Sequence, residues 1–169
     1  NTWLLKVPGT ESLVREESMT VTNVRRTTTD IEASKTLTGK ELTEGAFQFD
    51  LLDEDGSTVL QSVSNAANGT IIFQDIPLEG VGTHTFYIRE KTPEGGETNG
   101  ITYYDTVYRV VVTTGWNEKE QKRGVKSIQY YADGSETPSG GGAKFENVYE
   151  ATGSWTPKGT KVLTGRDMK

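Results

Sequence analysis

Three polar residues with complementary chemistry occupy positions where a β-strand pattern requires a hydrophobic side chain. Lys35, Glu90 and Asn147 each lie in a short stretch in which polar and apolar residues alternate, as they do along a strand with one buried face. Their apolar companions on the same face are Ile31, Ala33 and Leu37 for the lysine, Phe86 and Ile88 for the glutamate, and Ala143, Phe145 and Tyr149 for the asparagine. The alternation therefore predicts that an amine, a carboxyl group and an amide all point into the core.

These three groups could form a covalent cross-link if they meet in a dry interior. Burial lowers the pKa of a lysine and raises that of a glutamate, so Lys35 and Glu90 could exist there as a neutral amine and a neutral acid. A neutral amine is a nucleophile, and a protonated Glu90 could polarise the Asn147 carbonyl and carry protons to the departing nitrogen. The product would be an amide between Lys35 and Asn147, formed once with loss of ammonia. The same pattern also fits residues that point to solvent, or a buried Lys–Glu pair held only by hydrogen bonds.

The composition excludes several other kinds of chemistry. The chain has 169 residues, 18 basic against 24 acidic, and a net charge of −6, which argues against binding to nucleic acid or to an anionic membrane surface. There is no cysteine, and His84 is the only histidine, so disulfides, thiolate zinc sites and multi-histidine metal sites are ruled out. We expect no cofactor and no metal. No apolar run approaches the roughly 18 residues of a membrane span, and no signal or anchoring segment is recognised, as expected for a fragment of a longer exported protein.

The elements that must position the three residues are all predicted to be strands. We expect strands at 2–7, 19–24, 31–37, 46–52, 58–63, 70–73, 84–90, 101–114, 124–132 and 143–149. The segment 101–114 is the longest of them, and the pair Asn68-Gly69 is a strong hairpin signal. No segment has a helical period. Many short strands separated by Gly, Asn, Asp and Pro turns predict an all-β chain folded as an antiparallel β-sandwich or barrel.

An internal repeat predicts the domain boundaries. Asn23-Val24 followed by Lys35-Thr36-Leu37-Thr38-Gly39 is matched by Asn147-Val148 followed by Lys161-Val162-Leu163-Thr164-Gly165. The spacing of the two lysines indicates a tandem array with a period of about 125 residues. Residues 1–24 would then be the closing hairpin of one repeat, 25–150 a complete repeat, and 151–169 the opening strand of the next.

Five short motifs in order give the complete repeat a family resemblance. They are Ala33-Ser34-Lys35-Thr36-Leu37-Thr38-Gly39, Gly45-Ala46-Phe47-Gln48-Phe49-Asp50-Leu51, Phe86-Tyr87-Ile88-Arg89-Glu90-Lys91, Gly100-Ile101-Thr102-Tyr103-Tyr104-Asp105 and Lys144-Phe145-Glu146-Asn147. With them, residues 25–150 resemble the streptococcal pilin isopeptide-linkage domain, one of the Gram-positive surface domains with internal Lys–Asn cross-links. The resemblance implies a β-sandwich of the pilin or adhesin type (Ig-like, CnaB-like) in a protein anchored to the cell wall.

The resemblance also assigns roles to residues. It implies that Lys35 and Asn147 are the bonding pair and that Glu90 is the catalytic acid. By the same match Asn23 is the acceptor of the preceding repeat and Lys161 the donor of the following one, and we expect neither to be bonded within this chain.

Two functions remain open at this stage. The first is a structural stalk repeat of a pilin or adhesin, stabilised by the autocatalytic cross-link, with neighbouring repeats as its partners. The second is an adhesive module that binds a host glycan or matrix protein through the loops at 93–99 and 133–142. Trp3, Trp116, Trp155 and the tyrosines at 103, 104, 130 and 131 could form a glycan platform, although we expect them to pack in the core. We expect the Asp53–Gly56 segment to be a solvated turn rather than a calcium loop, and no enzyme activity beyond the single cross-linking event.

Overall fold

The computed structural model describes residues 27–151, 156–159 and 165, and within them it places ten strands and no helix. The strands are β1 (Thr27–Thr38), β2 (Gln48–Leu52), β3 (Val59–Ser64), β4 (Thr70–Leu78), β5 (Gly82–Glu90), β6 (Glu97–Thr98), β7 (Ile101–Thr102), β8 (Val107–Asn117), β9 (Lys122–Ala132) and β10 (Ala143–Tyr149). The predictions at 2–7 and 19–24 lie outside the described residues. None of the described residues belongs to a helix long and apolar enough to cross a bilayer.

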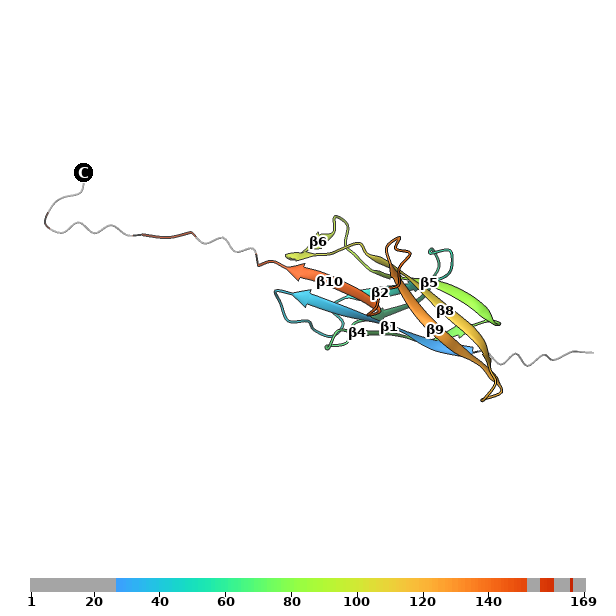
Figure 1. The fold of residues 1–169 in the computed structure, drawn as a ribbon. Helices are drawn as coiled ribbons and strands as arrows, with labels where there is room; N and C mark the ends of the chain where they lie inside the picture. Colours follow the sequence, from blue (N-terminus) through green and yellow to red (C-terminus); the bar gives the residue numbers. More distant parts are fainter. Residues whose placement is uncertain (1–26, 152–155, 160–164, 166–169) are drawn as a thin grey trace, which may run out of the picture.

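The strands form two sheets that pack face to face (Figure 1). One sheet has the order β4-β1-β10-β7-β6 and the other β3-β2-β5-β8-β9. The predicted all-β sandwich is confirmed. Every strand pair in the described part is antiparallel except one, because β1 and β10 run parallel, with Lys35 opposite Phe145 and Leu37 opposite Asn147. Parallel neighbours need a long connection, and here the remaining strands of the domain provide it.

The core lies between the two sheets and is built from the alternating residues of each strand. Phe145 of β10 connects the layers, since its ring centroid lies 5.1 Å from that of Phe49 on β2 and 5.2 Å from that of Tyr108 on β8. The buried hydrophobic residues are Ile31, Ala33, Phe47, Phe49, Leu51, Leu52, Ile71, Phe73, Ile76, Leu78, Phe86, Ile88, Tyr108, Val110, Val112, Ala143 and Phe145. Burial of this set supplies most of the free energy that holds the sheets together.

The predicted strand at 101–114 is wrong as a single element. Residues 101–102 are β7 in the first sheet and residues 107–117 are β8 in the second, so the chain changes sheets between them. The residues that pack on the core change parity at the same point, from Ile101 and Tyr103 to Tyr108 and Val110. One continuous strand cannot make that change, because shifting by one residue turns every side chain to the other face.

The predicted strand at 70–73 is too short, since β4 continues through Pro77 to Leu78. Proline lacks an N–H and is tolerated in a strand only where no partner needs that donor. β4 is the edge strand of its sheet, and β1 is its one partner there, so Pro77 does not interrupt the ladder. Asp75, with a φ of 56°, marks an irregularity in the same strand.

The expectation that the aromatic residues pack in the core holds for Tyr103 and Tyr130 and is wrong for Trp116, Tyr104 and Tyr131, the last of which lines a pocket on the outer face of the second sheet. Trp116 is 53% exposed and Tyr104 is 51% exposed. β8 pairs with β5 as far as Thr114, and beyond it only with β9, so Trp116 extends past the region that the sandwich covers. Trp3 and Trp155 lie outside the described residues.

Candidate cross-linking site

Three strands bring the lysine, the glutamate and the asparagine to one point between the sheets. Lys35 and Asn147 lie on the adjacent parallel strands β1 and β10, and Asn147 sits opposite Leu37, two residues beyond Lys35 and on the same inward face. Glu90 is the last residue of β5 in the facing sheet. The carboxyl group therefore approaches the amine and the amide from across the core.

The Glu90 carboxyl group bridges the other two side chains. Lys35 Nζ donates to Glu90 Oε2 at 2.7 Å, and Asn147 Nδ2 donates to Glu90 Oε1 at 2.9 Å. The relative exposure of Lys35, Glu90 and Asn147 is 3%, 4% and 0%. All three polar groups are thus withdrawn from water, and the bridging hydrogen bonds hold them together.

Aromatic rings surround the amine. Lys35 Nζ lies 4.5 Å from the centroid of Phe47 and 6.0 Å from that of Phe49. The ring of Tyr103 meets Phe47 edge-on at 5.7 Å. The face of an aromatic ring attracts a cation only weakly. The main effect of these rings is therefore to exclude water from the amine and the groups beside it.

Burial shifts both titrating groups toward their neutral forms. Desolvation lowers the pKa of the Lys35 amine below its ordinary value of 10.5, and the hydrogen bond and charge of Glu90 oppose that shift. Desolvation likewise raises the pKa of the Glu90 carboxyl above 4.5, against the hydrogen bonds from Lys35 and Asn147. Burial and the nearby Glu90 charge raise the pKa of Tyr103. Because the pKa values of Lys35 and Glu90 are shifted toward each other, a proton can pass between the two groups at a low cost in free energy.

Of the two polar atoms in the Asn147 amide, only the nitrogen has a hydrogen-bond partner among the described residues. The nitrogen faces the carboxylate, whereas Oδ1 is buried. The sequence led us to expect the carbonyl against Glu90. An ionised carboxylate is an acceptor only and therefore takes the N–H group, while a protonated one could donate to the oxygen.

A glycine turn fixes the backbone at the lysine, and sequence reasoning did not find this contact. The Lys35 amide donates to the Gly69 carbonyl at 2.7 Å. Gly69 has a φ of 86°, and a Cβ there would collide with the Lys35 carbonyl oxygen. The Asn68-Gly69 signal in the sequence predicts a tight turn, but which backbone it contacts depends on the pairing of β1 with β4.

The other predicted site residues, Asn23 and Lys161, lie outside the described residues. Among the described residues, no group of three or more His, Cys, Asp or Glu side chains could hold a metal ion. The Asp53–Gly56 segment is an exposed turn in which Asp55 accepts hydrogen bonds from the backbone and hydroxyl of Ser57.

Comparison with known families identifies the sandwich. Residues 31–150 match the FctA family model, described as a Spy0128-like isopeptide containing domain. The chain belongs to this family. The resemblance to streptococcal pilin domains drawn from the sequence motifs is confirmed, and the matched residues of the FctA domain include Lys35, Glu90 and Asn147.

A solved pilin shares the fold of this FctA domain. The major pilin T-13 from Streptococcus pyogenes serotype GAS131465 matches at 19% identity and a TM-score of 0.53, over 73% of this chain and 53% of that chain. Another major pilin from Streptococcus pyogenes matches at 20% identity and a TM-score of 0.49, over 71% of this chain and 49% of that one. The chain thus spans about half the length of these pilins. No curated protein matches.

Proposed function

We propose that this domain is a structural shaft module of a Gram-positive pilin or adhesin, closed by an isopeptide bond between Lys35 and Asn147 that Glu90 promotes. The observation that supports it most directly is the buried Glu90 carboxyl group bridging the amine of β1 and the amide of β10. Membership of an isopeptide-containing family supports it independently.

The reaction begins with a proton moving from the Lys35 ammonium to the Glu90 carboxylate. The charged pair and the neutral pair hold the same number of protons, and burial favours the neutral one. The protonated acid donates a hydrogen bond to Asn147 Oδ1 once the amide group rotates by half a turn, which gives a partner to an oxygen that has none in the described part of the chain. Polarisation of that carbonyl makes Cγ of Asn147 electrophilic.

The amine nitrogen of Lys35 then attacks Cγ of Asn147, and the C–N bond to Nδ2 breaks. Glu90 accepts a proton from the attacking nitrogen and delivers one to the departing nitrogen, which leaves as ammonia. An amine and a primary amide thus give a secondary amide and ammonia, with Glu90 restored. The fixed positions of the three groups replace the high reactant concentration that the uncatalysed reaction would need.

The cross-link changes where tension acts. The chain enters β1 at Thr27 and leaves β10 at Tyr149, and because the strands are parallel these points lie at opposite ends of the sandwich (Figure 1). Load entering β1 would pass along about 26 Å of strand to Lys35, cross the new bond, and leave through the last residues of β10. The strands between them in sequence would carry little of it.

The position in the parent protein follows from the repeat pattern. Neighbouring repeats would be the partners, with Asn23 completing the site of the preceding unit and Lys161 that of the following one. The boundaries 1–24, 25–150 and 151–169 and attachment to the cell wall belong to this proposal.

Intact mass tests the bond. The purified chain should weigh less than its sequence by one ammonia, and Glu90→Ala should restore the full mass. Fragmentation should recover one branched peptide containing Lys35 and Asn147. Asp50→Asn is the matched control, because Asp50 is a buried carboxylate that contacts Lys91 away from the site, and this variant should still lose ammonia. A wild-type chain of full mass would contradict the proposal.

A further inference from the structure

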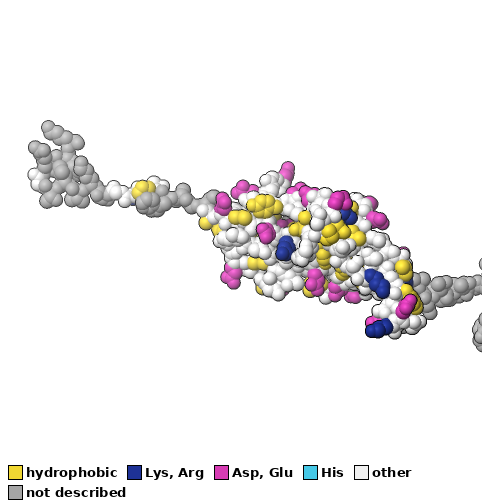
Figure 2. Space-filling view, viewed as in Figure 1, with side chains coloured by type: hydrophobic (Ala, Val, Ile, Leu, Met, Phe, Trp, Pro, Cys, Tyr) yellow, Lys and Arg dark blue, Asp and Glu magenta, His cyan; other side chains and the backbone are white. Residues whose placement is uncertain are grey.

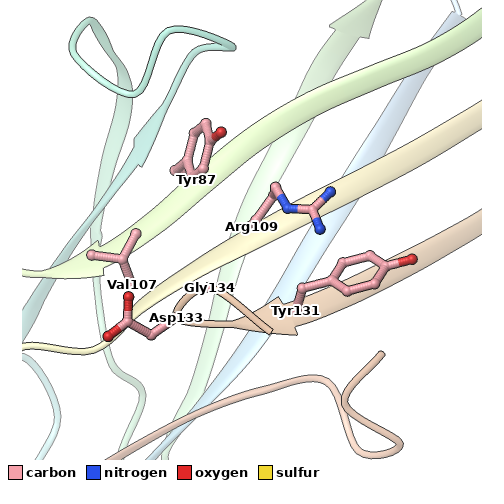
Figure 3. Close-up of a pocket in the computed structure, with 6 residues that line it drawn as sticks. All are labelled: Tyr87, Val107, Arg109, Tyr131, Asp133 and Gly134. Carbon is pink, nitrogen blue, oxygen red and sulfur yellow. The ribbon is translucent and has the colours of Figure 1, made fainter. Parts of the chain in front are cut away.

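The outward face of the second sheet carries a pocket that the cross-link does not use. β5, β8 and β9 align Tyr87, Arg109 and Tyr131 in one row across the sheet, since Tyr87 pairs with Arg109 and Arg109 with Tyr131. Together with Val107, Asp133 and Gly134 they line a pocket of about 230 Å³ (Figure 3). That volume is of the order of one sugar ring or one amino acid. Figure 2 shows acidic and apolar side chains scattered over one face of the domain rather than gathered in one large patch.

Arg109 is the group in this pocket that points to a ligand. Its guanidinium carbon lies 4.3 Å from the centroid of the Tyr131 ring, and within the described part of the chain it forms no ion pair. Arg89, in the next row of the same face, differs because it lies 3.6 Å from Asp50. Stacking occupies the face of a guanidinium and leaves the N–H groups at its edge available, and that edge matches a carboxylate bidentately.

The other lining residues narrow the class of ligand. Figure 3 shows Arg109 between the two tyrosines, with Asp133 beside Val107 at the other end of the pocket. A carboxylate such as Asp133 accepts hydrogen bonds and repels a second anion, so that end favours a hydrogen-bond donor, such as a hydroxyl group, over a second anionic group. A phosphate or a polyanion would meet Asp133 and a chain of net charge −6. A ligand with one carboxylate and several hydroxyl groups satisfies both ends, and its ring can pack against Tyr87, because Arg109 covers one face of the Tyr131 ring.

We propose that this pocket binds a carboxylate-bearing sugar, such as a uronic or sialic acid at the end of a glycan. Arg109 would hold the carboxylate, Asp133 would accept from the ring hydroxyl groups, and Tyr87 and Tyr131 would form the walls. The pocket lies on the outer face of a sheet, whereas Lys35, Glu90 and Asn147 lie between the sheets. The two proposals are therefore independent, and either can fail without the other.

Nuclear magnetic resonance titration of the full chain tests the pocket. Glucuronic acid and N-acetylneuraminic acid are the probes, with glucose and inorganic phosphate as comparisons. At least one acidic sugar should give saturable shifts of the amides of residues 107–109 and 131–134, while glucose and phosphate should not. Absence of saturable shifts with both acidic sugars, or equal shifts with phosphate, would overturn the proposal.

Variants locate the binding. Arg109→Gln should weaken binding about tenfold or more, and Arg109→Lys should also weaken it, because it keeps the charge but loses the planar fork. Lys119→Gln removes the same charge from the exposed β8–β9 turn and should bind as the wild type does. Unchanged affinity in Arg109→Gln would exclude this pocket. Loss of ammonia in each variant shows that the fold is intact, and if the cross-link proves absent, the spectra of the variants serve the same purpose.

Discussion

Replacing Glu90 by glutamine separates the cross-link from the fold that surrounds it. Glutamine has the size of glutamate, its oxygen can accept from Lys35, and its nitrogen can donate to Asn147 Oδ1, which has no partner among the described residues. It cannot take up and release protons as a carboxyl group does. Glu90→Gln should therefore fold, keep the full mass, and lack the bond between β1 and β10.

The size of the stability change follows from the positions of the two bonded residues. The loop that the bond closes contains roughly 110 residues, and the chain-entropy relation for a cross-link of that span gives about 4–5 kcal/mol. Unfolding entropy of about 2.1 cal/mol/K per residue, over a domain of roughly 120 residues, converts this into a difference in Tm of about 15–20 °C. Glu90→Gln should unfold that much below the wild type.

Calorimetry with intact mass measured on the same samples provides the assay. Asp50→Asn removes the same charge from another buried carboxylate, should keep the bond, and should unfold within a few degrees of the wild type. If Glu90→Gln kept the full mass and yet unfolded at the wild-type temperature, the reasoning that joins the bond to the closed loop would be refuted.

Two further predictions concern the groups around the bond. Gly69→Ala should slow cross-linking and lower the free energy of unfolding by more than about 1 kcal/mol, because a Cβ there collides with the Lys35 carbonyl oxygen. Gly45→Ala is the control, since Gly45 also has a positive φ, of 74°, but has open space around a Cβ. If both variants lost the same free energy of unfolding in urea, the collision with Lys35 would be excluded as the cause. Asn147→Ala leaves Lys35 and Glu90 without a covalent link, and the stability of this variant should depend on pH in both the acidic and the alkaline range. The raised pKa of Glu90 adds stability that is present below pH 4.5 and lost as the pH rises through the folded value, whereas the lowered pKa of Lys35 adds stability that is present above pH 10.5 and lost as the pH falls through its folded value. The free energy of unfolding of Asn147→Ala, measured with urea across this pH range, should pass through a minimum between pH 4.5 and pH 10.5. The minimum should be absent when Glu90→Gln and Lys35→Met are added to the variant. A maximum in that range would contradict the assigned pKa shifts.

The sequence shows the candidate site more clearly than it shows the topology. Lys35, Glu90 and Asn147 are visible because each interrupts an apolar face, and alternation depends only on neighbours along the chain. Which strands lie side by side depends on pairing between distant parts of the chain. The alternation along each strand therefore could not show that β1 and β10 are parallel neighbours, or that the Glu90 carboxyl group bridges Lys35 and Asn147.

Some of the missed features did leave a signal. The apolar parity changes between Tyr103 and Tyr108, and that change marks the point where the chain moves from one sheet to the other. Others left none: Trp116 continues the inward parity of Val112 and Thr114, and it is 53% exposed because β5 pairs with β8 only as far as Thr114.

The place of β10 in its sheet bears on the order in which the module is completed. β10 is the last strand of the described sandwich, yet it lies between β1 and β7 rather than at an edge. While a chain synthesised from its amino end is incomplete, the central position of this sheet between β1 and β7 is therefore vacant and the Asn147 amide is still absent. The proposed cross-link could form only after β10 has filled that position, so a truncated or stalled chain would stay accessible to proteases, whereas a finished one would be closed covalently.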